Sequence, residues 1–445
     1  MLALKKYSKY KESGLPWLGS IPAHWSVRRA KQIFIPIDIR SKDGNEELLT
    51  VSSKDSVLPR SQKKVTMFKA ESYVGYKLCW PGDLVINSLW AWARGLGFSR
   101  YHGIVSSAYG VYRPKPQFAS AFPYFDYLLR SDLYNWELHV RSKGIWVSRL
   151  QLTDESFFDM PIVVPPVDEA EKIAAYIKVQ DLQIRKLIRA KRRVIELLNE
   201  QKQAIILRAV TRGFDPNVRL MPSGIEWLGA IPAHWETKRL KWVTRLQRGY
   251  DLPSERRLPG PVPVVSSGGI IGSHREARAE APGVVMGRYG STDSVFYLEE
   301  PFWPHNTSLF VTDFQGNFPR WCYYLLRVVA KVDLGSKSAV PGVDRKDLYE
   351  ISVAVPPVRE QPSIVEQTEN RLSQFEKETL SVQRQIDLLR EYRTRLIADV
   401  VTGKLDVRGV ELPELNDVEE VSDLVDEELE DSQELEAVEE STDAD

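Results

Sequence analysis

Two histidines stand where an imidazole could act on a substrate or a metal ion, and each is followed directly by tryptophan. His24-Trp25 and His234-Trp235 close the segments Ser13–Trp25 and Ser223–Trp235, which are identical at ten of 13 positions. Imidazole is a general acid or base near neutral pH and a common metal ligand. Because the pair recurs with no second ligand nearby in the sequence, we interpret it as a packing element.

Other catalytic patterns are incomplete. An amino-methyltransferase needs an Asn- or Asp-Pro-Pro-aromatic motif, but both Pro-Pro pairs here are flanked by valines, at Val164 and Val355. The glycines of Ser267–Gly272 have the wrong spacing for a dinucleotide site, and the sequence contains no P-loop. The carboxylates and lysine of Asp168–Lys172 could suit a nuclease, but they lie at a predicted helix start, where capping explains them. We therefore expect a non-catalytic chain that binds no metal or cofactor.

The charge is distributed unevenly. The net charge is −1, yet residues 411–445 hold 17 of the 61 acidic residues and no lysine or arginine. Residues 1–410 therefore carry 60 basic against 44 acidic residues, a formal charge of +16, which favours a polyanionic partner. We expect the acidic tail to be disordered. It could compete with nucleic acid for the basic body or dock on a partner.

Side chains that contact nucleic acid are Arg and Lys for phosphates and guanine, Asn and Gln for adenine, and Ser or Thr for either. The candidates on predicted loops of the first half are Asn87, Ser88, Trp90, Trp92, Arg94, Lys143, Trp146 and Arg149. Those of the second half are Arg256, Arg257, Ser266, Ser267, His274, Arg275, Arg288, Tyr289, Asn306, Lys337 and Arg345. Trp90 and Trp92 are the weaker candidates, because large aromatic residues are usually buried.

The chain is long enough for two or three domains with full cores, at 445 residues. No apolar run reaches the roughly 20 residues that span a bilayer, and Met1–Lys5 does not lead into a signal-peptide core. Cys79 and Cys322 have no partner at metal-ligand spacing, so we expect two buried thiols in a reduced chain. These features predict a cytoplasmic location and no contact with a membrane.

The chain is a tandem duplication. The Trp-containing segments repeat at an offset of 210 residues, whereas Val164–Val167 repeats as Val355–Val358 at an offset of 191. Each half therefore has constant ends and a variable middle, which is 19 residues shorter in the second copy. A period of this length predicts two complete domains of one fold.

Long helices follow both Pro-Pro pairs. Residues 167–213 and 358–403 carry apolar stripes at three- and four-residue spacing and end at glycine. Such stripes are best buried if the two helices pair antiparallel as a coiled-coil spacer. Short β-branched runs in the variable middles predict strands, at Leu84–Ile86, Val284–Met286, Val295–Tyr297 and Leu309–Val311, and short helices at Ala121–Leu129 and Phe318–Leu326.

The predicted fold is thus α+β, with two related domains separated by two long antiparallel helices around a pseudo-two-fold axis. The predicted divisions are a first domain over 1–166, the first helix over 167–213, a second domain over 214–357, the second helix over 358–403 and a C-terminal segment over 404–445.

The ordered set of motifs resembles the specificity (S) subunits of type I restriction-modification systems. It comprises the paired Trp-Leu-Gly-x-Ile-Pro-x-His-Trp segments, the paired Val-Pro-Pro segments, and helices that end in Thr211–Asp215 and Thr402–Asp406. Further similar stretches are Gly82–Trp90, Gly103–Tyr109, Gly287–Ser291, Pro301–Asn306 and Gly342–Leu348. The resemblance covers residues 13 to 408 and does not include the acidic tail.

The resemblance implies that each variable middle is a target-recognition domain for one half of a bipartite, asymmetric site in double-stranded DNA. The helices would set the unread spacer and dock two methyltransferase subunits, and restriction subunits would join through these. S-adenosylmethionine would bind the methyltransferase, and ATP and Mg the restriction subunit, so adenine methylation and DNA cleavage in host defence would belong to partners.

Three alternatives stay open. The chain could be a self-sufficient DNA-modifying enzyme, which the missing catalytic motifs oppose. It could be a coiled-coil scaffold for proteins, which the basic body opposes. Within the family, it could serve a methylation-only system that lacks a restriction partner, and the sequence does not separate that case.

Overall fold

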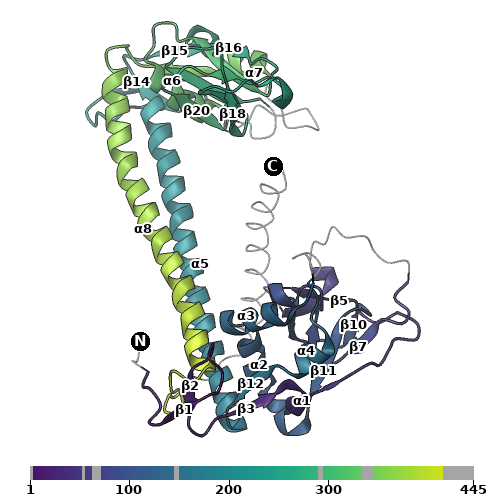
Figure 1. The fold of residues 1–445 in the computed structure, drawn as a ribbon. Coiled ribbons are helices and arrows are strands. Elements are labelled where there is room, and N and C mark those ends of the chain that lie inside the picture. Colours follow the sequence, from purple (N-terminus) through teal and green to yellow (C-terminus); the bar gives the residue numbers. More distant parts are fainter. Residues whose placement is uncertain are drawn as a thin grey trace. The chain divides into compact units, whose positions relative to one another are not determined.

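The computed structural model describes residues 4–52, 56–62, 72–144, 150–288, 294–332 and 344–413. The chain forms two compact units, the first from residues 1–190 and 385–445 and the second from residues 191–384. Each unit combines a mixed α+β domain with part of two long helices, α5 (Val167–Thr211) and α8 (Gln361–Val401) (Figure 1). The expected combination of α+β domains with two long helices is therefore confirmed.

The first unit is built around an antiparallel four-stranded sheet. Its strand order is β4-β11-β8-β9, from Phe34–Pro36, Gly110–Pro114, Leu84–Ile86 and Leu96–Phe98. The smaller pairs are β1 (Tyr10–Glu12) with β2 (Ser20–Pro22), β3 (Ser26–Arg29) with β12 (Pro161–Val164), β5 (Leu49–Ser52) with β6 (Ser56–Pro59), and β7 (Lys77–Cys79) with β10 (Gly103–Val105). The α-helices are α1 (Ala30–Ile33), α2 (Phe122–Leu129), α3 (Asp132–Arg141) and α4 (Asp154–Phe158).

The second unit repeats this plan. Its four-stranded sheet has the order β16-β22-β19-β20, from Arg245–Arg248, Ser308–Asp313, Gly283–Gly287 and Val295–Leu298. The other strands are β13 (Leu220–Pro222) with β14 (Ala230–Pro232), β15 (Glu236–Arg239) with β23 (Ser352–Val355), and β17 (Val262–Ser266) with β18 (Gly269–His274) and β21 (Trp303–Pro304). The helices are α6 (Pro319–Val329) and α7 (Arg345–Glu350). The expected strands and short helices are confirmed in both units.

Within each unit the two long helices contribute to the core of the globular domain. In the first unit, Ile173 and Ile177 of α5 share a core with Val400 of α8, and Asp181 forms an ion pair with Arg393. In the second unit, Ile206 and Val210 of α5 share a core with Ile364 and Leu372 of α8. Residues near the start of α5 pack with residues near the end of α8, and residues near the end of α5 with residues near the start of α8. The paired portions therefore run antiparallel, as expected.

Glycine ends both helices, as the sequence predicted. Gly213 and Gly403 have φ values of 65° and 75°, the left-handed conformation that side chains with a Cβ rarely adopt. A Cβ at Gly403 would lie 2.4 Å from the ring of Pro22. The chain therefore leaves each helix where it contacts the Trp-containing segment of the same unit.

Both cysteines are buried and unpaired, as expected. Burial raises the pKa of the Cys79 thiol to about 11 and raises that of Cys322 further. Within the described part of the chain, no cluster of three or more potential metal ligands occurs. The described helices include none that is long and apolar enough to cross a membrane.

Candidate nucleic-acid interface

The His-Trp pairs have the packing role predicted for them. His24 and Trp25 both hydrogen-bond to Glu169 in the first turn of α5. His234 and Trp235 hydrogen-bond in the same way to Glu360, directly before α8. Each pair thus joins a domain to the start of the long helix that follows it.

A polar groove of about 590 Å³ lies at one edge of the four-stranded sheet of the second unit, the edge that is formed by strand ends and not by an outer strand. At this edge β16 and β19 end and β22 begins, because Arg248 is paired with Leu309, and Gly287 with Ser308. The groove is lined by Gln247, Arg248, Gly249, Tyr250, Asp251, Arg288, Asn306, Leu309, Asp344 and Arg345. Three arginines face two carboxylates here, so the groove carries a net positive charge.

Hydrogen bonds hold the polar side chains of this groove. Arg248 Nε donates to the carbonyl oxygen of Asn306 at 3.3 Å, and Asn306 Nδ2 donates to Asp251 Oδ1 at 2.6 Å. Since a carboxylate only accepts, the second bond fixes which end of the Asn306 amide faces away from Asp251. Arg345 Nη1 donates to the carbonyl oxygen of Leu246 at 3.2 Å. The groove therefore presents oriented donors and acceptors, as base recognition requires.

The absence of a side chain at Gly249 allows two segments of the chain to approach each other closely at this edge. A Cβ at this position would lie 2.1 Å from the carbonyl oxygen of His305. The Gly249 amide donates to the carbonyl oxygen of Ser308 at 3.0 Å. Only glycine permits this approach, which brings Arg248 and Tyr250 against the segment that carries Asn306.

The same edge of the first unit has a different lining. There β8 ends, β11 begins and residues 87–95 connect β8 to β9. This connection holds five of the predicted residues, namely Asn87, Ser88, Trp90, Trp92 and Arg94. Asn87 Nδ2 donates to the Tyr109 hydroxyl at 3.2 Å, and Ser88 Oγ donates to the carbonyl oxygen of Ala108 at 3.1 Å. Equivalent sheet edges thus gather unlike polar and aromatic side chains.

The structure brings together only part of the predicted set. In the second unit, Arg288, Asn306 and Arg345 line one groove. Arg256 and Arg275 are exposed outside that lining, whereas Arg257 Nη1 donates to the carbonyl oxygen of Ile271 at 2.6 Å. Ser267 is half-buried, and its amide donates to Thr307 Oγ1. In the first unit, Lys143 is exposed and pairs through its backbone with Gln151.

Two residues of the predicted set have structural roles. His274 is buried, and its Nδ1 accepts a hydrogen bond from the Leu258 amide at 3.0 Å while its ring packs edge-on to Trp303. Ser266 is buried in the turn between β17 and β18, where its Oγ donates to the carbonyl oxygen of Gly269. Trp146, Arg149, Tyr289 and Lys337 lie outside the described residues, as does the acidic tail beyond Pro413.

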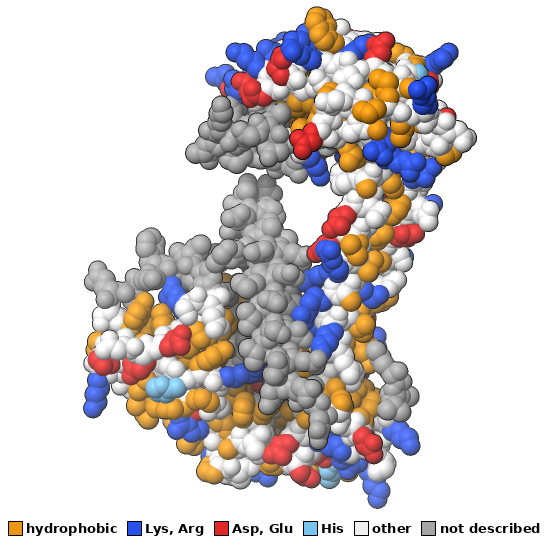
Figure 2. All heavy atoms as spheres, turned by 180° about the vertical axis from the view of Figure 1, so that it is seen from behind, with side chains coloured by type: hydrophobic (Ala, Val, Ile, Leu, Met, Phe, Trp, Pro, Cys, Tyr) orange, Lys and Arg blue, Asp and Glu red, His pale blue; other side chains and the backbone are white. Residues whose placement is uncertain are grey.

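The groove is also lined by Arg248, Tyr250 and Asp251, which were not among the candidates predicted from the sequence. The available signal was the run Arg248-Gly-Tyr-Asp251, which begins at the last residue of β16. Nearby, burial and the charge of Arg257 lower the pKa of His305. Figure 2 shows Lys and Arg side chains spread over the face of the second unit that is in view.

The whole chain was compared with known proteins. No protein-family model matches it, and no curated protein matches it. A chain from a structure of complex assembly and conformational transition in the type I R-M system is 16% identical, with a TM-score of 0.64 over 86% of this chain and 99% of that one. The protein has the fold of that type I restriction-modification chain. The resemblance seen in the sequence is therefore confirmed at the level of the fold.

Two further type I restriction-modification structures were found. The HsdS subunit from Thermoanaerobacter tengcongensis is 17% identical, with a TM-score of 0.48 over 86% of this chain and 98% of that one. The type I restriction-modification S subunit from M. genitalium is 14% identical, with a TM-score of 0.34 over 88% of this chain and 97% of that one.

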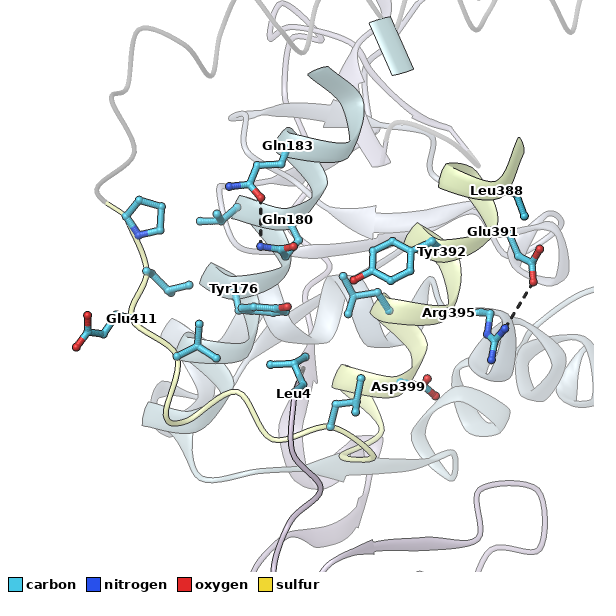
Figure 3. A pocket seen from close by; sticks show the side chains of 16 residues that line it. Leu4, Tyr176, Gln180, Gln183, Leu388, Glu391, Tyr392, Arg395, Asp399 and Glu411 are labelled. Carbon is cyan, nitrogen blue, oxygen red and sulfur yellow. Dashed lines mark hydrogen bonds and ion pairs between the residues drawn. The ribbon is translucent and has the colours of Figure 1, made fainter. Parts of the chain in front are cut away.

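A second, less polar groove lies in the first unit, between α5 and α8. Tyr176 and Gln180 of α5 face Tyr392 of α8 across it (Figure 3), and Leu396 of α8 also lines it. Residues from both ends of the described chain also line this groove, including Leu4, Leu405 and residues 410–413. Leu388 at its end is 58% exposed.

Proposed function

We propose that this chain is the DNA-specificity subunit of a type I restriction-modification complex. Each α+β domain recognises one half of a bipartite, asymmetric site in double-stranded DNA. The helices α5 and α8 set the length of the unread spacer and dock methyltransferase subunits.

The observation that carries this proposal is the repeated sheet edge with unlike linings. In the second unit, Arg248, Arg288 and Arg345 line it together with Asn306. In the first unit, the connection of residues 87–95 occupies the equivalent place. One scaffold with two different sets of hydrogen-bonding side chains suits two different half-sites. The formal charge of +16 on residues 1–410 favours the phosphate backbone as the shared part of both contacts.

Catalysis is assigned to partners in this proposal. Two methyltransferase subunits bind S-adenosylmethionine and methylate adenine, and restriction subunits bind ATP and Mg and cleave DNA. The groove between α5 and α8 in the first unit is a suitable docking surface, because it combines exposed Leu388 with the side chains of Tyr176 and Tyr392.

Methylome sequencing tests the proposal. Cells that carry this chain with its cognate methyltransferase subunit are compared with cells that carry the methyltransferase alone. We expect one bipartite methylated motif that depends on this chain, which would give both half-sites and the spacer. An assembled complex that produces no new motif would contradict DNA specificity and favour a protein scaffold.

A DNA mobility shift at several salt concentrations supplies an independent check. When a protein binds DNA through phosphates, the logarithm of the binding constant falls linearly with the logarithm of the salt concentration. A scaffold that binds only proteins would give no shift. Phage restriction in the same cells would then distinguish a complete restriction system from a methylation-only one.

A further inference from the structure

Residues 87–95 form a closed connection with extensive internal hydrogen bonding. The Asn87 amide donates to the carbonyl oxygen of Gly95, and the Gly95 amide donates to that of Trp90, both at 2.8 Å. Arg94 adopts a left-handed conformation with φ 62°, and its side chain forms an ion pair with Asp132 of α3. A Cβ at Gly95 would lie 2.7 Å from the Trp90 carbonyl oxygen. The backbone of Trp90 is therefore held in place.

This closed connection nevertheless presents a large apolar tip to solvent. Trp90 is 58% exposed and Leu89 is 46% exposed, whereas the neighbouring Ala91 is fully buried. Leaving such side chains in water forgoes the free energy that their burial would contribute. An ordered loop that exposes a tryptophan and a leucine side by side is suited to a partner that covers them.

Trp92 supports the indole of Trp90 from one side. The two rings are stacked, with centroids 5.9 Å apart and planes 17° apart. Trp92 Nε1 donates to the Leu89 carbonyl oxygen at 2.9 Å, and its ring packs edge-on to His139 of α3. With one ring face occupied and its support fixed, Trp90 can offer the other face to a second flat π-system.

We propose that Leu89 and Trp90 form a wedge that stacks on a nucleobase of the DNA bound by the first unit and opens a base step there. The inference rests on the proposed function and adds a specific contact to it. Apolar side chains inserted between base pairs partially unstack and kink the duplex, and each base stacked on an aromatic ring contributes about 1–3 kcal/mol.

The surroundings of the wedge favour nucleic acid over a protein partner. Arg94 lies at its base, and Lys77 Nζ donates to the carbonyl oxygen of Tyr109, whose hydroxyl accepts from Asn87. The wedge also occupies the sheet edge that is equivalent to the arginine-lined groove of the second unit. Basic grooves and aromatic stacking surfaces are the two features by which proteins hold unstacked bases, and the equivalent strand ends of the two domains supply one each.

The test uses the complete complex with its methyltransferase subunit and a short duplex that carries the motif found by methylome sequencing. Thymines are placed in and beside the first half-site but not opposite the methylated adenine, because permanganate attacks a thymine only when it is unstacked and a methyltransferase flips its target base out of the stack. The variants are Trp90→Ala, Trp90→Phe and, as a control, Trp242→Ala. Trp242 is 59% exposed and lies in the second unit, where Arg245 covers its ring.

In the wild-type complex we expect permanganate-reactive thymines at the first half-site. Trp90→Ala should remove this reactivity and weaken binding roughly 5- to 150-fold, the equivalent of one lost stack. The salt dependence of binding should not change, because no phosphate contact is lost. Trp90→Phe should keep most of both signals, and Trp242→Ala should keep all of them.

Three outcomes would overturn the wedge. Trp90→Ala could bind the duplex with unchanged affinity, the wild-type complex could bind without any reactive thymine, or Trp90→Ala could lose the methyltransferase subunit on purification, which would identify a protein interface. Failure of the proposed function would differ from all three, since the wild-type complex would then bind the motif no better than a scrambled duplex.

Discussion

The indole Nε1 of Trp25 donates a hydrogen bond of 3.0 Å to Oε1 of Glu169, and this bond ties the first domain to the first turn of α5. The same carboxylate accepts from the Tyr7 hydroxyl at 2.6 Å and lies 2.7 Å from His24 Nε2. A carboxylate at a helix N-terminus also interacts favourably with the helix dipole. Glu360 repeats this relationship more loosely, with Trp235 Nε1 at 3.4 Å and His234 Nε2 at 3.0 Å.

Replacing Glu169 with alanine should destabilise the first unit by about 2–4 kcal/mol. The substitution leaves the donors of buried Trp25 and Tyr7 without an acceptor, and each such loss costs about 1–3 kcal/mol. Glu360→Ala is the matched control, because its side chain is 34% exposed against 4% for Glu169. We expect a shift for Glu360→Ala of about 1 kcal/mol or less. Scanning calorimetry measures both, and equal shifts would show that burial does not set the strength of this contact.

Gly249→Ala should disrupt the groove of the second unit. The new Cβ would meet the His305 carbonyl oxygen, and the strain should cost about 1–3 kcal/mol. Gly268→Ala is the control, since a Cβ there has only Ser266 Oγ within reach, at 4.0 Å. In the methylome assay we expect Gly249→Ala to lose or relax the second half-site. Normal methylation by this variant would show that the groove tolerates displacement and does not determine specificity.

Arg248→Ala should relax the preference for one base in the second half-site. Its guanidinium is anchored on the Asn306 carbonyl oxygen, and one lost base contact costs about 1–3 kcal/mol. Arg239→Ala is the control, because Arg239 is paired with Glu350 at 2.7 Å and does not line the groove. Competition binding with duplexes altered at single positions measures the effect. A uniform loss for every duplex, with a salt slope smaller by about 1, would instead indicate a phosphate contact.

The second unit should lose stability as pH falls below about 6.5, in part through His305. Burial, together with the nearby charge of Arg257, lowers the pKa of this imidazole in the folded protein. The unfolded chain therefore takes up a proton at higher pH than the folded one, so the stabilisation is present above the ordinary pKa and decreases through the window below it. The midpoint of urea unfolding between pH 5 and pH 8 measures this. His305→Gln should flatten the profile, and an unchanged profile would assign the pH dependence to other groups.

The local signals in the sequence predicted the fold well. The apolar stripes on α5 and α8 have helical spacing, and Gly213 and Gly403 end these helices through a conformation that favours glycine. The β-branched runs that became β8 and β19 are short and bounded by turn residues. Each of these features depends on residues close together in the chain, which is why the sequence was sufficient.

The site depended on contacts between distant residues, and there the prediction was incomplete. Arg288, Asn306 and Arg345 were chosen by residue type, but only the pairing of β19, β22 and β16, with the bond from Arg345 of α7 to Leu246, brings them to one edge. His274 was among the predicted DNA contacts, yet pairing of β17 with β18 places its ring against Trp303. The acceptor for Trp25, Glu169, is 144 residues away in sequence, and no local pattern indicated it.

Lengthening both long helices equally should lengthen the spacer that the complex accepts without changing either half-site. The change is an insertion of seven residues into each helix, between Ala190 and Lys191 and between Arg384 and Gln385. Both positions fall at the limits of the two compact units, so the insertions leave the contacts within each unit intact. Seven residues keep the apolar stripe nearly in phase and add about 10 Å to each helix, roughly the rise of three base pairs. Methylome sequencing should then report the same half-sites with a spacer longer by up to about three base pairs. Insertion into one helix alone is the control and should prevent a defined motif, because the two stripes no longer match. An unchanged spacer in the double insertion would show that the helices do not measure the distance between the half-sites.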